Sequence, residues 1–263
     1  VELLRDMRER GDLYKNESGI WVEGSALDWE TLPARVEAVI EQRVGRLEQE
    51  LREILVVASV EGEEFTAEVV AWIRGIDRRQ LVRRLSSELD KHHHLVLAQG
   101  IQRIGSGRLS LYRFQHNLFQ KYLYDSLDEV ERSILHEEIG NRLVELYGGE
   151  TDEIAAQLAR HFEEAGIPEK AIDYLLLAGK KAIQLSAHSE AIAQLTKGLA
   201  LLESVPASAE RDRQELALQL ALGVPLQVTR GPGATEVGQA YTRARELYYQ
   251  IGQPNQLYPA LWG

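Results

Sequence analysis

Hydrophobic residues recur at three- and four-residue steps along most of this chain, which is the period of an amphipathic helix. The pattern becomes regular after Pro33, a residue that suits the first turn of a helix, and a second helix in the same stretch ends at Gly62. A short third helix is expected over 66–73, and Asp77 is placed to cap a fourth. The fourth helix would turn these residues inward: Leu81, Val82, Leu85 and Leu89. The chain is therefore predicted to be mainly α-helical.

The period changes in two places, where short alternating segments predict strands. His94–Leu97 and Leu109–Phe114 are the two segments, and the Gly-containing stretch Gly100–Gly107 is predicted to be the loop between them. An earlier stretch, Leu13–Val22, has short β-like pieces around a polar turn. Three helices followed by a two-stranded wing is the order of a winged-helix domain. We place this domain, together with the helices that follow the wing, over residues 31–147. Residues 1–30 are interpreted as the tail of a helical lid region and a linker.

Helix-length segments then follow the break at Gly148-Gly149 with a spacing of about 20 residues. Pro168–Leu175 and His188–Leu195 carry near variants of the same core, and a third pair is expected in Ala207–Val228 and Ala234–Gly252. Small residues recur where helices would approach closely: Ala155, Ala159, Ala171, Ala178, Ala182 and Ala191. This pattern predicts a tetratricopeptide-like helical-repeat superhelix over 150–263, which we expect to continue beyond the sequence given.

The composition narrows the classes of function. The chain has 263 residues and a formal net charge of −11, so a nucleic-acid partner is disfavoured. It has no cysteine, which excludes disulfides and thiolate metal sites and makes a cytoplasmic location the default expectation. No apolar run reaches the roughly 18 residues of a membrane span, so no membrane partner is expected.

Among the candidate functional residues, His116 is the most informative because a predicted strand meets a predicted helix there. A helix N-terminus gathers backbone N–H groups and positive dipole, so this position suits a phosphate. The densest basic cluster is a second candidate, and in a winged-helix order it would belong to a DNA-reading helix: Arg78, Arg79, Arg83 and Arg84. A solvated, partly salt-bridged helix face is the preferred interpretation of that cluster.

Three further groups carry weaker signals. A metal site could combine the run His92-His93-His94 with His136 or His161, but three consecutive residues do not all face one ion, so no metal is expected. The acidic stretch 61–64 precedes a helix and is interpreted as dipole complementation, not catalysis. A set of aromatic residues is interpreted as packing between repeats, with partner binding as the alternative: Tyr241, Tyr248, Tyr249, Tyr258 and Trp262.

The order of these pieces resembles the middle of bacterial signal-transduction ATPases of the STAND class that carry tetratricopeptide arrays. The resemblance rests on a helix with Ile40 and Arg43, the stretch Ala58–Phe65, Phe114-x-His116, and Arg132-x-x-x-His136, followed by repeat-like helices. It implies a helical lid, a winged-helix domain and a repeat array that follow an ATPase core. In related proteins the histidine of a Met-His-Asp motif contacts the β-phosphate of ADP; here the triplet is Gln115-His116-Asn117, so the histidine carries over and the acidic residue does not.

No Walker motif occurs in the sequence, so this chain is not expected to be an enzyme. The resemblance implies ATP or ADP as the cofactor of the intact parent, with none held by this fragment alone. The implied partners are an upstream nucleotide-binding domain, clamped through His116, and a protein or small-molecule inducer on the repeats. The alternative is a DNA-binding winged-helix transcriptional regulator with a helical-repeat sensor domain.

Overall fold

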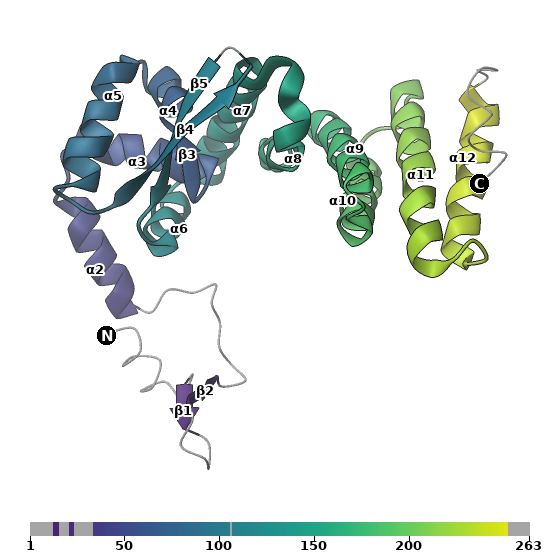
Figure 1. The fold of residues 1–263 in the computed structure, drawn as a ribbon, viewed down its shortest axis with the longest axis horizontal. Helices are drawn as coiled ribbons and strands as arrows, with labels where there is room; N and C mark the ends of the chain where they lie inside the picture. The colour runs from purple at the N-terminus through teal and green to yellow at the C-terminus, as the bar shows by residue number, and fades with distance from the viewer. Residues whose placement is uncertain (1–12, 16–20, 24–33, 106, 252–263) are drawn as a thin grey trace. The chain divides into compact units, whose positions relative to one another are not determined.

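The computed structural model describes residues 13–15, 21–23, 34–105 and 107–251 (Figure 1). The prediction of a mainly helical chain is confirmed, and a small antiparallel sheet accompanies the helices. The chain divides into two compact units. The first comprises the residues up to Gln102 together with Arg108–Asp128, and the second comprises Arg103–Gly107 and the residues from Glu129 onward.

The β-like pieces expected near the N-terminus form a hairpin. Strand β1 (Leu13–Lys15) pairs antiparallel with β2 (Trp21–Glu23), with Tyr14 opposite Val22. The rest of the predicted lid tail and linker over 1–30 lies outside the described residues.

The first unit is built from short helices packed on a three-stranded sheet. Its helices have local sequence reasons for their ends: Asp77 accepts hydrogen bonds from the backbone N–H groups of Arg79 and Gln80, at 2.9 and 3.1 Å, and Gly75 ends the preceding helix in the left-handed region with φ +63°. The helical elements are α2 (Ala34–Gly45), α3 (Gln49–Glu61), α4 (Ala67–Arg74), α5 (Arg78–Arg84) with a π-helical continuation (Leu85–Asp90), and α6 (Asn117–Asp125).

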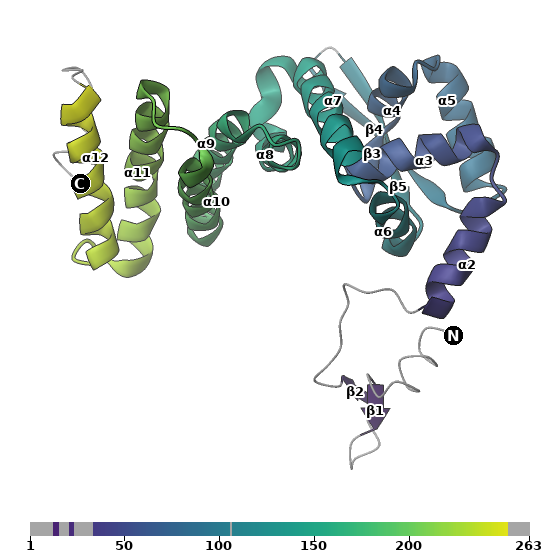
Figure 2. The same cartoon turned by 180° about the vertical axis from the view of Figure 1, so that it is seen from behind.

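The predicted inward face of the fourth helix is confirmed for its leucines. Leu81, Leu85 and Leu89 are fully buried, whereas Val82 is half-buried. Burying each leucine contributes about 2 kcal/mol to the stability of this unit. Helix α3 packs against β3, α4 and α6, and Figure 2 shows it in front of the sheet.

The predicted two-stranded wing needs correction, because the sheet has three strands. Short β3 (Glu64–Thr66) pairs antiparallel with β5 (Gly107–Phe114), which also borders β4 (Val96–Ile104), in the order β3-β5-β4. The predicted loop 100–107 is also wrong, since β4 continues to Ile104. Six consecutive residues of β4 are exposed, so no apolar alternation marked this part of the strand in the sequence.

The second unit is a series of helices, α7 to α12, and each packs against the next (Figure 1). The break at Gly148-Gly149 is a 3₁₀ segment, η2 (Gly148–Ile154). The helices are α7 (Glu129–Tyr147), α8 (Ala155–Glu164), α9 (Pro168–Gln184), α10 (His188–Leu201), followed by the short η3 (Leu202–Ser204), α11 (Ala209–Arg230) and α12 (Thr235–Ile251). The predicted third pair is thus confirmed within two residues at each end. Helix α7 was predicted to belong to the winged-helix domain over 31–147. In the structure it packs against α8, in the second unit.

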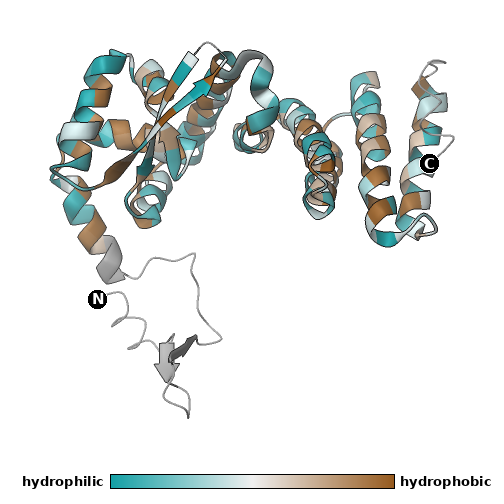
Figure 3. Ribbon diagram, viewed as in Figure 1, coloured by the Kyte–Doolittle hydropathy of each residue, from teal (hydrophilic) through white to brown (hydrophobic). Residues whose placement is uncertain are grey.

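Small residues hold these helices close together. A Cβ at Gly179 of α9 would lie 2.6 Å from Cγ of Leu195 in α10, and one at Gly198 would lie 2.9 Å from Cδ2 of Leu218 in α11. The leucines fill the space that the glycines leave, so each helix buries a hydrophobic stripe on the next. Figure 3 shows hydrophobic and hydrophilic residues sharing each of these helices. None of the described helices combines the length and apolar character that a membrane crossing requires.

Candidate functional site

His116 lies at the junction where β5 ends and α6 begins, as the sequence predicts. Its backbone is extended, with φ −139° and ψ 134°, and its side chain makes no capping hydrogen bond to the helix. The imidazole is exposed. The position therefore presents a ring nitrogen to solvent beside the first turn of a helix, which is an arrangement that can contact an anion.

Two backbone hydrogen bonds hold this junction in place. Phe114 N–H donates to the carbonyl of Glu63, and Gln115 N–H donates to the carbonyl of Leu95, at 2.9 and 2.8 Å. Because the acceptors lie directly before β3 and directly before β4, the backbone before His116 is fixed to two other segments of the chain.

A ring and a cation complete the surroundings of His116. The His116 ring lies 6.3 Å from the buried ring of Phe119, centroid to centroid. The guanidinium of Arg43 lies 4.9 Å from the centroid of the same phenyl ring, and it donates to the carbonyl of His93 at 2.8 Å. Phe119 thus contacts both Arg43 and His116, two residues on which the family resemblance rests. Their spacing in the sequence did not predict this arrangement.

The basic cluster on α5 is divided between paired and exposed side chains. Arg84 Nη2 lies 2.9 Å from Glu50 Oε2, and Arg78 Nη1 lies 3.7 Å from Glu68 Oε1. Arg79 and Arg83 are exposed one turn apart, and they form no ion pair with any carboxylate of the described residues. The expected mixture of solvated and salt-bridged side chains is what the structure shows.

The acidic stretch before α4 has a structural role. Glu61 is buried, and its carboxylate accepts hydrogen bonds from the N–H and the hydroxyl of Thr66, at 3.0 and 2.9 Å. Nearby, the Glu68 carboxylate accepts from the N–H and the hydroxyl of Ser110. These bonds tie β3 and α4 to the end of α3 and to β5.

His136 and His161, which the sequence suggested only as separate candidates for a metal site, form a buried pair. Nδ1 of His136 on α7 lies 2.8 Å from Nδ1 of His161 on α8, and both side chains are fully buried. Arg160 Nη2 lies 3.5 Å from Nε2 of His161 and can only donate, which favours His161 Nδ1–H as the donor to His136. Within the described ranges, no group of three or more His, Asp or Glu side chains is placed to hold a metal ion.

Burial keeps both imidazoles neutral. It lowers the pKa of His136 to about 4, with the positive charges of Arg160 and Arg132 acting in the same direction. It also lowers the pKa of His161 well below its ordinary value, again with Arg160 contributing. The run 92–94 forms no comparable buried pair. The rings of His92 and His93 pack edge to face, with their centroids 4.7 Å apart, and His94 has a positive φ of 52°.

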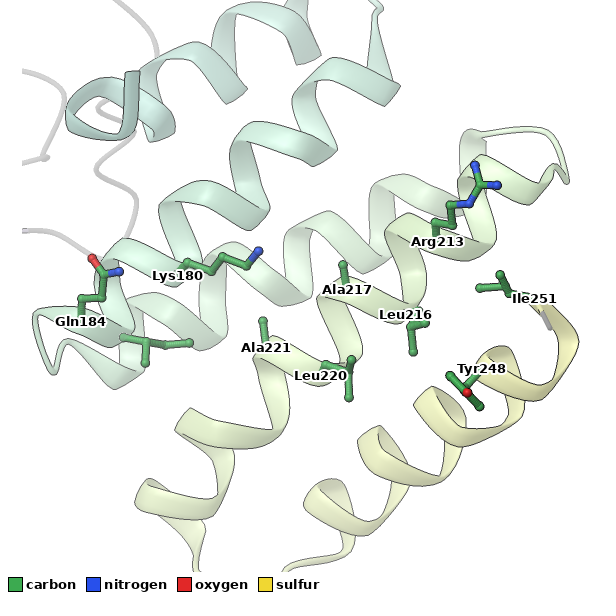
Figure 4. A pocket seen from close by; sticks show the side chains of 10 residues that line it. Lys180, Gln184, Arg213, Leu216, Ala217, Leu220, Ala221, Tyr248 and Ile251 are labelled. Atoms are coloured by element: carbon green, nitrogen blue, oxygen red, sulfur yellow. The ribbon is translucent and has the colours of Figure 1, made fainter. Parts of the chain in front are cut away.

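A hollow with a volume of about 660 Å³ lies on α9, α11 and α12 (Figure 4). Figure 4 shows Lys180 reaching from α9 over the hollow, with Ala217 and Ala221 of α11 facing it. Of the predicted aromatic set, Tyr248 lines this hollow and Tyr249 is 68% exposed. Tyr241 packs against Gly223, whereas Tyr258 and Trp262 lie outside the described residues.

Comparisons with known proteins give one distant relative. The chain is 28% identical over 154 residues to the uncharacterized protein R02095 of Rhizobium meliloti (strain 1021). The match covers 58% of this chain and 15% of that protein, so the chain corresponds to a small part of the relative's length. No family model matches the chain, and no solved structure matches it.

Proposed function

We propose that this chain is a non-catalytic regulatory region of a STAND-type signalling ATPase. In this proposal the first unit is a winged-helix-like domain that clamps a nucleotide-binding domain, and the helices of the second unit are tetratricopeptide-like repeats that bind a partner or inducer. The observation that carries the proposal is the exposed His116 at the β5–α6 junction, followed along the chain by paired helices.

The arrangement of the first unit supports the winged-helix part of the proposal. Helix α3, strand β3, helices α4 and α5 and the hairpin β4–β5 follow one another in the order of that fold, with β5 in the middle of the sheet. The hairpin is the wing, and the turn after it leads directly to His116. The low share of the Rhizobium relative that is matched also suits a region of a larger, multidomain protein.

The role of His116 follows from its exposure and its surroundings. An imidazole N–H beside the first turn of α6 would donate to a phosphate of ADP held by the nucleotide domain. Such a bond is present only in the closed state, so it would stabilise that state and keep the switch inactive. Asn117 stands in place of the family aspartate, and no carboxylate orients the ring from that position.

The test uses the parent protein with His116→Ala. Loss of one phosphate contact, worth about 1–2 kcal/mol, should raise the rate of ADP release and the basal ATPase activity by about five- to thirtyfold. The matched control is His92→Ala, which removes another exposed histidine of the same unit. Unchanged ADP release and unchanged basal activity in His116→Ala would contradict the clamp.

The second candidate function is DNA binding, and one observation favours it. Arg79 and Arg83 are exposed on α5, the helix that precedes the hairpin β4–β5. In a DNA-binding winged-helix domain the recognition helix would have this position. The net charge of the chain opposes this function, so the clamp is the better supported proposal.

A further inference from the structure

One face of α9 forms the wall of two adjoining hollows. Asp173, Leu177, Lys180 and Gln184 follow one another at steps of four, three and four residues, so they lie on a single stripe of the helix. Lys180 lines both the hollow shown in Figure 4 and a second one of about 450 Å³ towards the N-terminus of α9. We call the surface formed by these two hollows the α9 groove.

The charge of the α9 groove is opposite to that of the whole chain. The chain has 41 acidic and 30 basic residues, yet the charged side chains that line the two hollows are Lys170, Lys180, Arg213 and a single acid, Asp173. That carboxylate is already engaged, since it accepts from Gln214 Nε2 at 2.8 Å. Lys180 is exposed and has no ion pair among the described residues.

The floor of the groove is mainly aliphatic. Between the cations it is lined by these side chains from α9, α11 and α12: Ile183, Leu216, Ala217, Leu220, Ala221 and Ile251. From Lys170 to Gln184 the helix rises by about 21 Å, at 1.5 Å per residue. The second hollow adds Val144, Phe162, Tyr174, Leu176 and Leu177 to this lining. Apolar side chains with cations beside them fit a chain molecule that alternates apolar and anionic groups.

We propose that the α9 groove binds an acidic amphipathic peptide segment of a partner protein. Apolar side chains of the peptide would lie on the floor, and its carboxylates would pair with Lys180 and Arg213. At Arg213 the peptide carboxylate would compete with the exposed Glu210, which lies 2.8 Å from the guanidinium. A nucleic acid would match the cations and leave the aliphatic floor uncovered, because its outer surface is phosphate and sugar. The inference rests on the partner-binding role in the proposed function and names the chemistry of the partner.

The experiment uses the 263-residue chain and fluorescein-labelled synthetic peptides of about 14 residues, long enough for one helix along the groove. The first peptide has leucines at three- and four-residue steps with glutamates between them, the second has lysines in place of the glutamates, and the third has serines in place of the leucines. Fluorescence anisotropy should show that the first peptide binds and that the other two bind at least about tenfold more weakly.

The variant Lys180→Glu/Arg213→Glu should weaken binding of the acidic peptide by about tenfold or more and improve binding of the lysine peptide. The matched control is Arg46→Glu/Lys91→Glu, which changes the net charge equally at exposed sites of the first unit and should leave the affinity unchanged. Circular dichroism checks that both variants remain folded.

Three outcomes would overturn the proposal. These are equal affinities of the groove variant and the wild type, tighter binding of a thymidine oligonucleotide that competes with the peptide, and no binding of any of the three peptides. None of them affects the clamp proposal, which is tested separately by ADP release from the His116→Ala parent.

Discussion

At the scale of single residues, the buried pair His136–His161 is the clearest source of pH dependence. The folded state keeps both rings neutral, because burial and the neighbouring Arg132 and Arg160 oppose protonation. In the unfolded state each histidine protonates near its ordinary pKa of about 6.5. The unfolded state therefore binds more protons below that pH, and the free energy of unfolding falls as the pH falls.

We expect this loss to begin near pH 6.5 and, for His136, to continue to its folded-state pKa of about 4. The slope should reach about 1.4 kcal/mol per pH unit for each histidine. Urea denaturation of the wild type and of His136→Gln at pH 7 and pH 5 measures it. The variant should lose less stability between the two pH values than the wild type, whereas His92→Gln, at an exposed position, should lose the same amount. Equal losses in all three proteins would show that the pair is not held neutral.

At the scale of the elements, glycine decides how closely the helices of the second unit approach. Gly179→Ala would place a Cβ 2.6 Å from the Cγ of Leu195, so α9 and α10 must move apart or Leu195 must change its rotamer. Alanine gains about 1 kcal/mol in helix propensity, but overpacking costs about 1–3 kcal/mol, so we expect a net loss of stability.

The matched control is Gly238→Ala in α12, where an added Cβ would have no neighbour within 4 Å. There only the propensity remains, and the free energy of unfolding should rise by up to about 1 kcal/mol. Thermal or urea denaturation of the two variants should move the midpoint in opposite directions. A stabilised Gly179→Ala variant would mean that α9 and α10 are not packed as the structure has them.

At the scale of the whole molecule, the net charge of −11 bears on the DNA-binding alternative. A gel-shift titration on duplex DNA at two salt concentrations separates the two functions. We expect no tight binding, and we expect Arg79→Glu/Arg83→Glu to change nothing. Tight binding that weakens steeply with salt and is abolished by the double variant would favour the DNA reader over the clamp.

Helix positions could be predicted from the sequence because they depend on local spacing. Local spacing predicted the buried stripe Leu81, Leu85 and Leu89 and each helix of the third pair, and the residue type predicted the cap at Asp77. Each of these signals lies within about 20 residues of sequence. The strand β3 was missed because it has three residues and depends on its partner: Phe65 lies opposite Tyr112, 47 positions away. The exposed part of β4 was missed because its residues, from Ala98 to Arg103, show no alternation of apolar and polar positions and include Gly100, which suggested a loop.

The candidate sites also divide into those that local sequence predicts and those that depend on tertiary contacts. The sequence by itself determined the position of His116, because a strand-like pattern followed by a helical one is local, and it determined the absence of a Walker motif. Only the tertiary structure decided that His136 meets His161, that Arg43 lies over Phe119 near His116, and that cations from α9 and α11 line one groove. Each of these contacts joins side chains on different helices. Their distance in space depends on how the helices pack, which no local pattern encodes.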